Sequence, residues 1–183
     1  IIDIIFKNYI KTMTKINYQA LIEENYANNF SENSLPQNFS VGIYNGKQKF
    51  FSSYTIANKK ISHNKYISKN SLFRVASITK TFIAAAILQL RDLGRLTLDD
   101  PLLVHMPDFT VASSTSGTLE KVTIKRMLTH YSGLSTEHKF NSWETKKFIT
   151  KNELIDSLSE IDIVAQQDVQ WKYSNLAYCL LGI

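Results

Sequence analysis

The sequence contains a single cysteine, Cys179, among its 183 residues. An internal disulfide is therefore excluded, and the folded state has to be stabilised by packing. With 44% hydrophobic residues the chain is long enough to bury one sizeable core or two lobes. Cys179 itself lies in an apolar run, and we expect it to pack there.

Concentrated charge of one sign is absent as well. The 21 basic and 16 acidic residues give a net charge of +5, and the lysines are scattered along the chain. Scattered lysines give little support for a nucleic-acid partner, which usually selects a basic block or patch. Internal repeats and low-complexity tracts, which would indicate a solenoid or a disordered linker, are also missing.

Long hydrophobic runs are missing too. The apolar stretch Ile1–Phe6 is short, is interrupted by Asp3 and is not followed by a small-residue cleavage site. It therefore predicts neither a signal peptide nor a membrane span. The sequence begins with Ile1, and residues 176–183 have the pattern of a helix cut off in progress. We expect both ends to be edges of a fragment.

Local patterns predict a helix and a hairpin in the first third of the chain. Apolar residues recur at helical spacing over Ile16–Phe30. Asn45-Gly46 separates two strand-like runs, Phe39–Tyr44 and Lys47–Ala57, and Asn-Gly in this position is a strong signal for a two-stranded hairpin. The polar residues 58–70 are predicted to form a loop.

From Ser77 onward the sequence predicts mainly helices and loops. The first helix is expected over Ser77–Leu93, ends at Gly94 and has a continuous apolar stripe. Shorter helices are expected after Asp99-Asp100-Pro101, over 122–130, over 143–161 and at the end of the chain.

Two short motifs could carry chemistry. Ser77 and Lys80 lie three residues apart at a helix start, so their side chains share one face. A serine becomes a nucleophile when a base removes its proton, and a lysine can be that base if apolar neighbours such as Phe73 and Phe82 desolvate it. The alternative is that Ser77 is a helix cap and Lys80 a solvated residue.

The second motif is Tyr173-Ser174-Asn175. A tyrosine beside an ammonium group can relay protons, and an asparagine amide can donate to and accept from a substrate amide. Taken alone, Tyr173 could equally be a core aromatic and Asn175 a helix cap.

Taken in order, four segments of the chain resemble the serine β-lactamase and penicillin-binding protein superfamily, especially its class C β-lactamase, D,D-peptidase and esterase branch. The segments are Leu72–Phe82, Leu90–Leu102, Thr123–Leu134 and Tyr173–Gly182. The resemblance implies that Ser77 forms an acyl-enzyme, that Lys80 and Tyr173 share proton transfer, and that Asn175 holds the substrate's side-chain amide. No cofactor and no metal is implied, because a hydroxyl, an amine and a phenol suffice for acyl transfer.

The resemblance also implies an α+β, three-layer β-lactamase/transpeptidase-like fold. Residues 1–66 would supply the N-terminal helix and first hairpin of the α/β part, and residues 67–183 a mainly helical lobe that carries both motifs. The family's later Lys-Thr-Gly strand, which lines the site and gives a second oxyanion donor, has no match in this chain. We therefore expect later sheet strands to be missing and the isolated chain to be poorly active.

The sequence departs from the family pattern at two places. Ser53 and Thr55 replace two glycines of the second strand, and Gln167-Asp168 replaces a Pro-Gly pair before the tyrosine motif. A Ser132–His130 pair is an alternative nucleophile and base, although the family's corresponding histidine is structural. Trp143 and Trp171 are interpreted as core or rim aromatics.

Two functions remain open at this point. The first is a serine acyl-transfer hydrolase acting on a β-lactam, a D-alanyl peptide or an ester, with no nucleic acid among its partners. The second is a non-catalytic member or inactive fragment that keeps the fold as a binding module. The family resemblance alone implies an extracytoplasmic (periplasmic or secreted) location, and nothing in the sequence indicates an oligomeric state.

Overall fold

The structure is a computed structural model that describes residues 16–29, 38–44, 46, 49–57, 60–63, 67–114 and 116–183. The chain divides into two compact units, Ile1–Arg74 and Val75–Ile183. Across the described residues there are six α-helices and a three-stranded antiparallel sheet. This mixed composition confirms the predicted α+β class. The apolar stretch Ile1–Phe6 lies outside the described residues.

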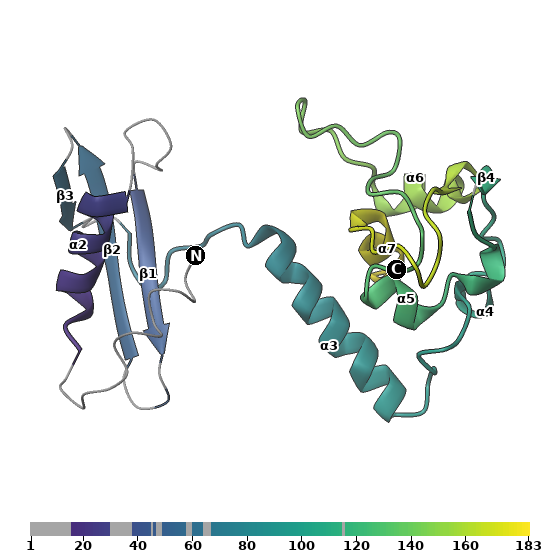
Figure 1. Ribbon diagram of the computed structural model, residues 1–183, viewed down its shortest axis with the longest axis horizontal. Helices are drawn as coiled ribbons and strands as arrows, with labels where there is room; N and C mark the ends of the chain where they lie inside the picture. The colour runs from purple at the N-terminus through teal and green to yellow at the C-terminus, as the bar shows by residue number, and fades with distance from the viewer. Residues whose placement is uncertain are drawn as a thin grey trace. The chain divides into compact units, whose positions relative to one another are not determined.

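The first unit is a small sheet with a helix on one face (Figure 1). Helix α2 spans Tyr18–Asn29, close to the predicted range. Strands β1 (Asn38–Tyr44) and β2 (Lys49–Ala57) form the predicted antiparallel hairpin, in a register that pairs Tyr44 with Lys49. Gly46 in the turn has a φ of 85°, which glycine adopts without a steric penalty.

Aromatic residues fill the interior of this unit. Tyr54 on β2 is 1% exposed and stacks on Phe39 of β1, with 5.1 Å between the ring centroids. The ring of Tyr18, at the start of α2, packs on Phe50 of β2 at 5.6 Å. These contacts attach the helix to the sheet.

A third strand corrects the prediction of a loop over residues 58–70. Strand β3 (Lys60–His63) pairs antiparallel with β2, so the sheet has the order β1-β2-β3 and not two strands. The segment Lys-Ile-Ser-His is mostly polar, which is why no hydrophobic pattern indicated it. Its backbone hydrogen bonds to β2 define the strand.

The second unit is mainly helical. Its α-helices are α3 (Thr79–Asp92), α4 (Leu102–His105), α5 (Ile124–Leu128), α6 (Lys151–Asp156) and α7 (Asn175–Leu181). Three 3₁₀ turns lie at Ala76–Ile78, Leu119–Lys121 and Leu158–Glu160. Two short strands, β4 (Ser113–Ser114) and β5 (Asp162–Ile163), pair in parallel.

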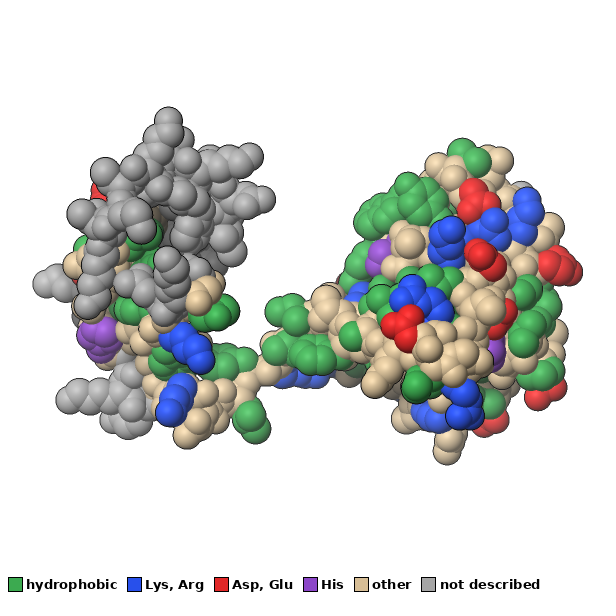
Figure 2. Space-filling view, turned by 90° about the horizontal axis from the view of Figure 1, so that it is seen from below, with side chains coloured by type: hydrophobic (Ala, Val, Ile, Leu, Met, Phe, Trp, Pro, Cys, Tyr) green, Lys and Arg blue, Asp and Glu red, His purple; other side chains and the backbone are tan. Residues whose placement is uncertain are grey.

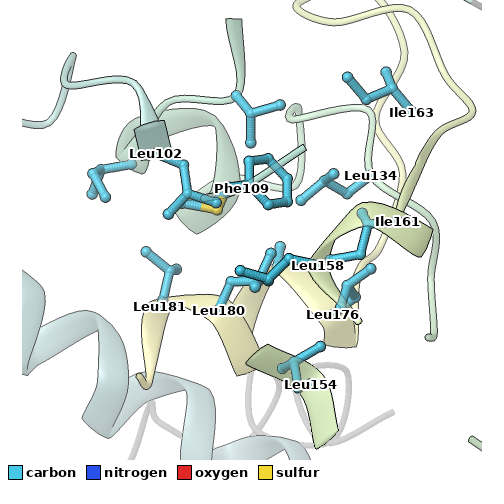
Figure 3. Packing of buried hydrophobic residues seen from close by; sticks show 14 of the residues in the cluster. Leu102, Phe109, Leu134, Leu154, Leu158, Ile161, Ile163, Leu176, Leu180 and Leu181 are labelled. Atoms are coloured by element: carbon cyan, nitrogen blue, oxygen red, sulfur yellow. The ribbon is translucent and has the colours of Figure 1, made fainter. Parts of the chain in front are cut away.

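The core of the second unit is apolar and continuous (Figure 3). Phe109, Leu134 and Ile163 are fully buried at its centre. Leu176, Leu180 and Leu181 project into it from one side of α7. Burial of these side chains fixes α7, and with it the tyrosine motif at the start of α7.

The predicted apolar stripe of α3 is only partly covered. Ile87 is buried and Ile83 is half-buried, whereas Phe82 is 69% and Leu93 68% exposed. Cys179 is also exposed, so the prediction that it packs in the apolar run is wrong. It lies on α7 between residues whose side chains point into the core, and the helical twist turns its thiol away from them.

On the face shown in Figure 2, basic and acidic side chains are interspersed over the second unit. This view shows no large patch of one sign there, in agreement with the scattered charges of the sequence. None of the described helices is long and apolar enough to cross a membrane.

Candidate functional site

The first motif lies where a 3₁₀ turn runs into α3. Ser77 is the middle residue of the turn Ala76–Ile78, two residues before α3 begins at Thr79. Lys80, three residues later, donates from Nζ to Ser77 Oγ at 3.3 Å. Ala76, directly before the serine, has a φ of 45°, in the left-handed region that favours glycine. Such strain is concentrated at functional sites.

The second motif is fixed by its buried central residue. Ser174 is 0% exposed and forms the N-cap of α7, with its Oγ accepting from Ala177 N at 2.9 Å. The same hydroxyl donates to the carbonyl of Ser135 at 2.7 Å. Tyr173 and Asn175 flank this anchored residue, so both side chains are held in place.

Replacing this anchor tests how firmly the motif is held. Ser174→Ala removes an N-cap and leaves the carbonyl of Ser135 without this donor, and we expect a loss of about 1–3 kcal/mol in the free energy of unfolding. Urea denaturation followed by tryptophan fluorescence measures it. Ser159→Ala, at an exposed serine, is the matched control. Equal stability of the two variants would contradict the assignment of Ser174 as an anchor.

The structure brings the four predicted side chains together. Ser77 Oγ and Tyr173 Oη lie 2.8 Å apart, although 96 residues separate them in the sequence. Lys80 Nζ donates to Asn175 Oδ1 at 2.5 Å. The ammonium group also lies 4.8 Å from the centroid of the Tyr173 ring. The hydroxyl, the amine, the phenol and the amide therefore form one hydrogen-bonded network.

The surroundings of Lys80 differ from those expected. Phe82 is 69% exposed, so it does not enclose the amine as predicted, and Phe73, the other residue named for this role, is 52% exposed. Its apolar neighbours are instead aromatic rings on the second motif and on α7. The ring of Tyr178 lies 5.5 Å from Nζ, next to that of Tyr173.

These contacts favour the ionised form of the Tyr173 phenol. Hydrogen bonding with Lys80 is the largest cause that lowers the pKa of Tyr173, followed by the hydrogen bond with Ser77. The positive charge of Lys80 lowers it further, whereas burial and the charge of Glu137 act in the opposite direction. A lowered pKa increases the fraction of the phenol that is ionised near neutral pH and can therefore accept a proton.

An oxyanion could be stabilised at the same place. Within the described part of the chain, the backbone N–H of Ser77 donates to no protein acceptor. A free N–H next to the serine hydroxyl has the position of an oxyanion-hole donor.

His130 is linked to the tyrosine motif and not to Ser132. Its Nδ1 accepts from the backbone N–H of Ser174 at 3.1 Å, and its ring packs on that of Tyr173 at 4.6 Å. Burial, and then the charge of Lys80, lower the pKa of His130. Ser132 is 1% exposed, and its buried hydroxyl has no hydrogen-bond partner among the described residues. The geometry therefore gives no support to a Ser132–His130 pair.

The lowered pKa of His130 predicts a loss of stability in acid. The unfolded chain binds this proton near pH 6.5, whereas the folded chain binds it only at lower pH. The contribution of His130 to the free energy of unfolding is therefore fully present above about pH 6.5 and decreases as the pH falls toward the pKa of the folded state. His130→Asn keeps an acceptor for Ser174, tolerates the φ of 64° and does not titrate. Between pH 7.5 and 5.5, urea denaturation should show a smaller decrease in the free energy of unfolding for this variant than for the wild type. Equal decreases in the two proteins would contradict the prediction.

One departure from the family pattern is compensated locally. Asp168 has a φ of 66°, where the family's glycine would be unstrained. Its carboxylate accepts two hydrogen bonds from the Arg126 guanidinium, which holds the pKa of this carboxyl below its usual range. Gln167, 5% exposed, bonds to Thr118 and to the carbonyl of Ser132. The two replacements thus fix the loop that leads to the tyrosine motif.

The structure adds a residue that the sequence did not single out. Glu137 accepts a hydrogen bond from Asn175 Nδ2 and another from Trp143 Nε1, the latter at 2.9 Å. The only sequence signal for Glu137 is its position three residues after Leu134, where the family-like segment Thr123–Leu134 ends. No spacing rule relates it to Asn175. Trp143 and Trp171 are 63% and 56% exposed, so they are rim residues and not core residues.

The chain is similar in sequence to known proteins. Protein flp of Staphylococcus aureus (strain NCTC 8325 / PS 47) is 31% identical over 116 residues, which cover 63% of this chain and 23% of that protein. Beta-lactamase-like protein 4 of Dictyostelium discoideum is 30% identical over 145 residues, 76% of this chain and 25% of that protein. The chain thus spans about a quarter of the length of these relatives.

A solved structure supports the fold. The chain is similar to a β-lactamase/D-alanine carboxypeptidase from Yersinia pestis, crystallised with citrate, with a TM-score of 0.64 and 25% identity. The match covers 89% of this chain and 47% of that protein. A model of the family described as Beta-lactamase matches residues 37–183, a range that contains both motifs. The chain therefore belongs to the Beta-lactamase family, within the serine β-lactamase/transpeptidase superfamily.

Proposed function

We propose that this chain is the nucleophile-bearing part of a serine acyl-transfer hydrolase and that Ser77 becomes acylated. The observation that carries the proposal is the contact of Ser77 Oγ with both Tyr173 Oη, at 2.8 Å, and Lys80 Nζ, at 3.3 Å. A nucleophile within hydrogen-bond reach of a candidate base is the arrangement that covalent catalysis requires. Membership of the Beta-lactamase family supports the same class of reaction.

In the proposed reaction, Ser77 Oγ attacks a substrate carbonyl and its proton passes to the unit formed by Tyr173 and Lys80. The Oγ–carbon bond forms, and the backbone N–H of Ser77 stabilises the negative oxygen. The carbon–nitrogen bond of a lactam or peptide, or the carbon–oxygen bond of an ester, then breaks. The leaving group takes up the proton. Water hydrolyses the acyl-enzyme and restores the serine hydroxyl.

Asn175 would position the acyl part of the substrate. Its Oδ1 is held by Lys80, so the amide group keeps one orientation beside the nucleophile. The substrates that fit this chemistry are β-lactams, D-alanyl peptides and small esters. Cell-wall peptides and β-lactams are met outside the cytoplasm, so the proposal includes an extracytoplasmic location.

Intact-protein mass spectrometry tests the proposal directly. A penicillin adds its whole mass when its ring opens on a serine, and a p-nitrophenyl ester adds its acyl group. We expect the 183-residue chain to gain one such adduct per molecule with at least one of these reagents. A chain that binds a penicillin reversibly in equilibrium dialysis, and gains no mass from either reagent, would favour the binding module instead.

A further inference from the structure

Glu137 is held rigidly next to Asn175. Its Oε1 accepts from Asn175 Nδ2 and from Trp143 Nε1, and its Oε2 accepts from Asn141 Nδ2 at 3.2 Å. A carboxylate has about four acceptor sites, so these three donors leave roughly one free. The donors come from two separate segments of the chain, which fixes the carboxylate in one position.

The charge of Glu137 is not neutralised by an ion pair. Among the described residues no Lys, Arg or His side chain lies within salt-bridge distance of it. Lys139, two residues away, pairs with Glu160 at 2.5 Å. The negative charge acts on the surrounding groups: it adds to burial in raising the pKa of Cys179, and it opposes the hydrogen bonds that lower the pKa of Tyr173.

The orientation of Asn175 determines which substrate groups suit this place. Its Oδ1 accepts from Lys80, and its Nδ2 donates to Glu137, so both ends of the amide are engaged. A substrate carbonyl could accept from the second N–H of Nδ2, which Glu137 leaves free, but it would gain no contact with the carboxylate itself. A substrate ammonium would instead donate to the free acceptor site of the carboxylate.

An aromatic ring lies beside the same carboxylate. Trp143 is 63% exposed, and its indole N–H points to Glu137. The N–H lies at the edge of the indole ring, so Trp143 orients the carboxylate and does not place the face of its ring beside it. Lys80, the cation of the hydrogen-bonded network, is engaged by Asn175 Oδ1.

We propose that Glu137 makes the acyl side of the site selective for substrates that carry a protonated amine next to the reacting part, over neutral ones. The inference rests on the proposed function, since it concerns the acyl donor that Ser77 attacks. It names a substrate class, namely aminoacyl compounds with a free amine.

Two penicillins differing by one amine test the inference. Ampicillin carries an α-amine on its side chain, and benzylpenicillin lacks only that amine. We expect the wild-type chain to be acylated about two- to fivefold faster by ampicillin at pH 6.5, the range that a partly exposed ion pair supports. In Glu137→Gln the ratio of the two rates should fall to about one. Glu144→Gln, which removes a charge from an exposed residue of the same segment, should keep the wild-type ratio.

The ratio separates selection from general damage to the site. A variant that merely misplaces Asn175 slows both penicillins equally and leaves the ratio unchanged, and this result would overturn the inference. Raising the pH to 9.5 deprotonates the α-amine, whose pKa is about 8, and should remove the preference of the wild-type chain. Equal wild-type rates at pH 6.5 would overturn the inference and leave the proposed function intact. Absence of any adduct would refute the proposed function itself.

Discussion

The Ser77→Ala chain should gain no mass from a penicillin or an ester under conditions in which the wild-type chain is acylated. Removing Oγ removes the atom that forms the covalent bond, so the loss should be complete and not partial. The fold should be preserved, because Ser77 is exposed and, among the residues that the structure describes, its side chain bonds only to Tyr173 and Lys80. Intact-protein mass spectrometry measures the stoichiometry of the adduct.

Thr79→Ala is the matched control for this variant. Thr79 is an exposed hydroxyl residue at the start of the same helix, and we expect its alanine variant to be acylated at the wild-type rate. If Ser77→Ala were acylated like the wild type, the nucleophile would lie elsewhere. Cys179 is an exposed residue and a candidate for such a reaction, although partial desolvation by the surrounding protein, and then the charge of Glu137, raise the pKa of its thiol and disfavour the reactive thiolate.

Loss of the proton-transfer unit should also have a large effect. Lys80→Met and Tyr173→Phe should each slow acylation about 10²–10⁴-fold, the range for removing a positioned acid or base. Stopped-flow measurements of the acylation rate with a chromogenic cephalosporin check this expectation. Tyr131→Phe, at a half-buried tyrosine outside the hydrogen-bonded network, should react at the wild-type rate.

The double variant shows whether the two residues act as one unit. Because Lys80 and Tyr173 both contact Ser77, their losses should not multiply, and the double variant should be only slightly slower than the slower single variant. The acylation rate of the wild type should rise with pH through the lowered pKa of Tyr173 and level off below the usual value of 10. Losses that multiply fully in the double variant would contradict the shared role. The same would follow if the acylation rate of Tyr173→Phe rose with pH as it does in the wild type.

Local sequence rules predicted the elements that form through short-range interactions. Asn45-Gly46 indicated the hairpin, and helical spacing indicated α2 and α3. Strand β3 was missed because Lys60–His63 has no apolar alternation and is defined by its pairing with β2. The exposure of Phe82 on α3 was also missed, since a hydrophobic stripe predicts burial without indicating which element covers it.

The candidate site was predictable to a similar extent. The spacing of Ser77 and Lys80 on one turn predicts that they are neighbours, and the structure places them 3.3 Å apart. Their proximity to Tyr173 depends on the packing of α7 and was predicted only through the family resemblance. Glu137 was missed because its link to Asn175 spans 38 residues and follows from tertiary structure alone.

The central claim is that Ser77 is the nucleophile and that its hydroxyl oxygen becomes acylated. Tryptic digestion of the penicillin-treated chain, followed by tandem mass spectrometry, locates the adduct. Cleavage after Arg74 and Lys80 releases the peptide Val-Ala-Ser-Ile-Thr-Lys, whose only serine is Ser77. We predict that the added mass lies on that serine. An adduct on any other peptide, or an unmodified digest from a chain that still consumes the penicillin, would contradict the account.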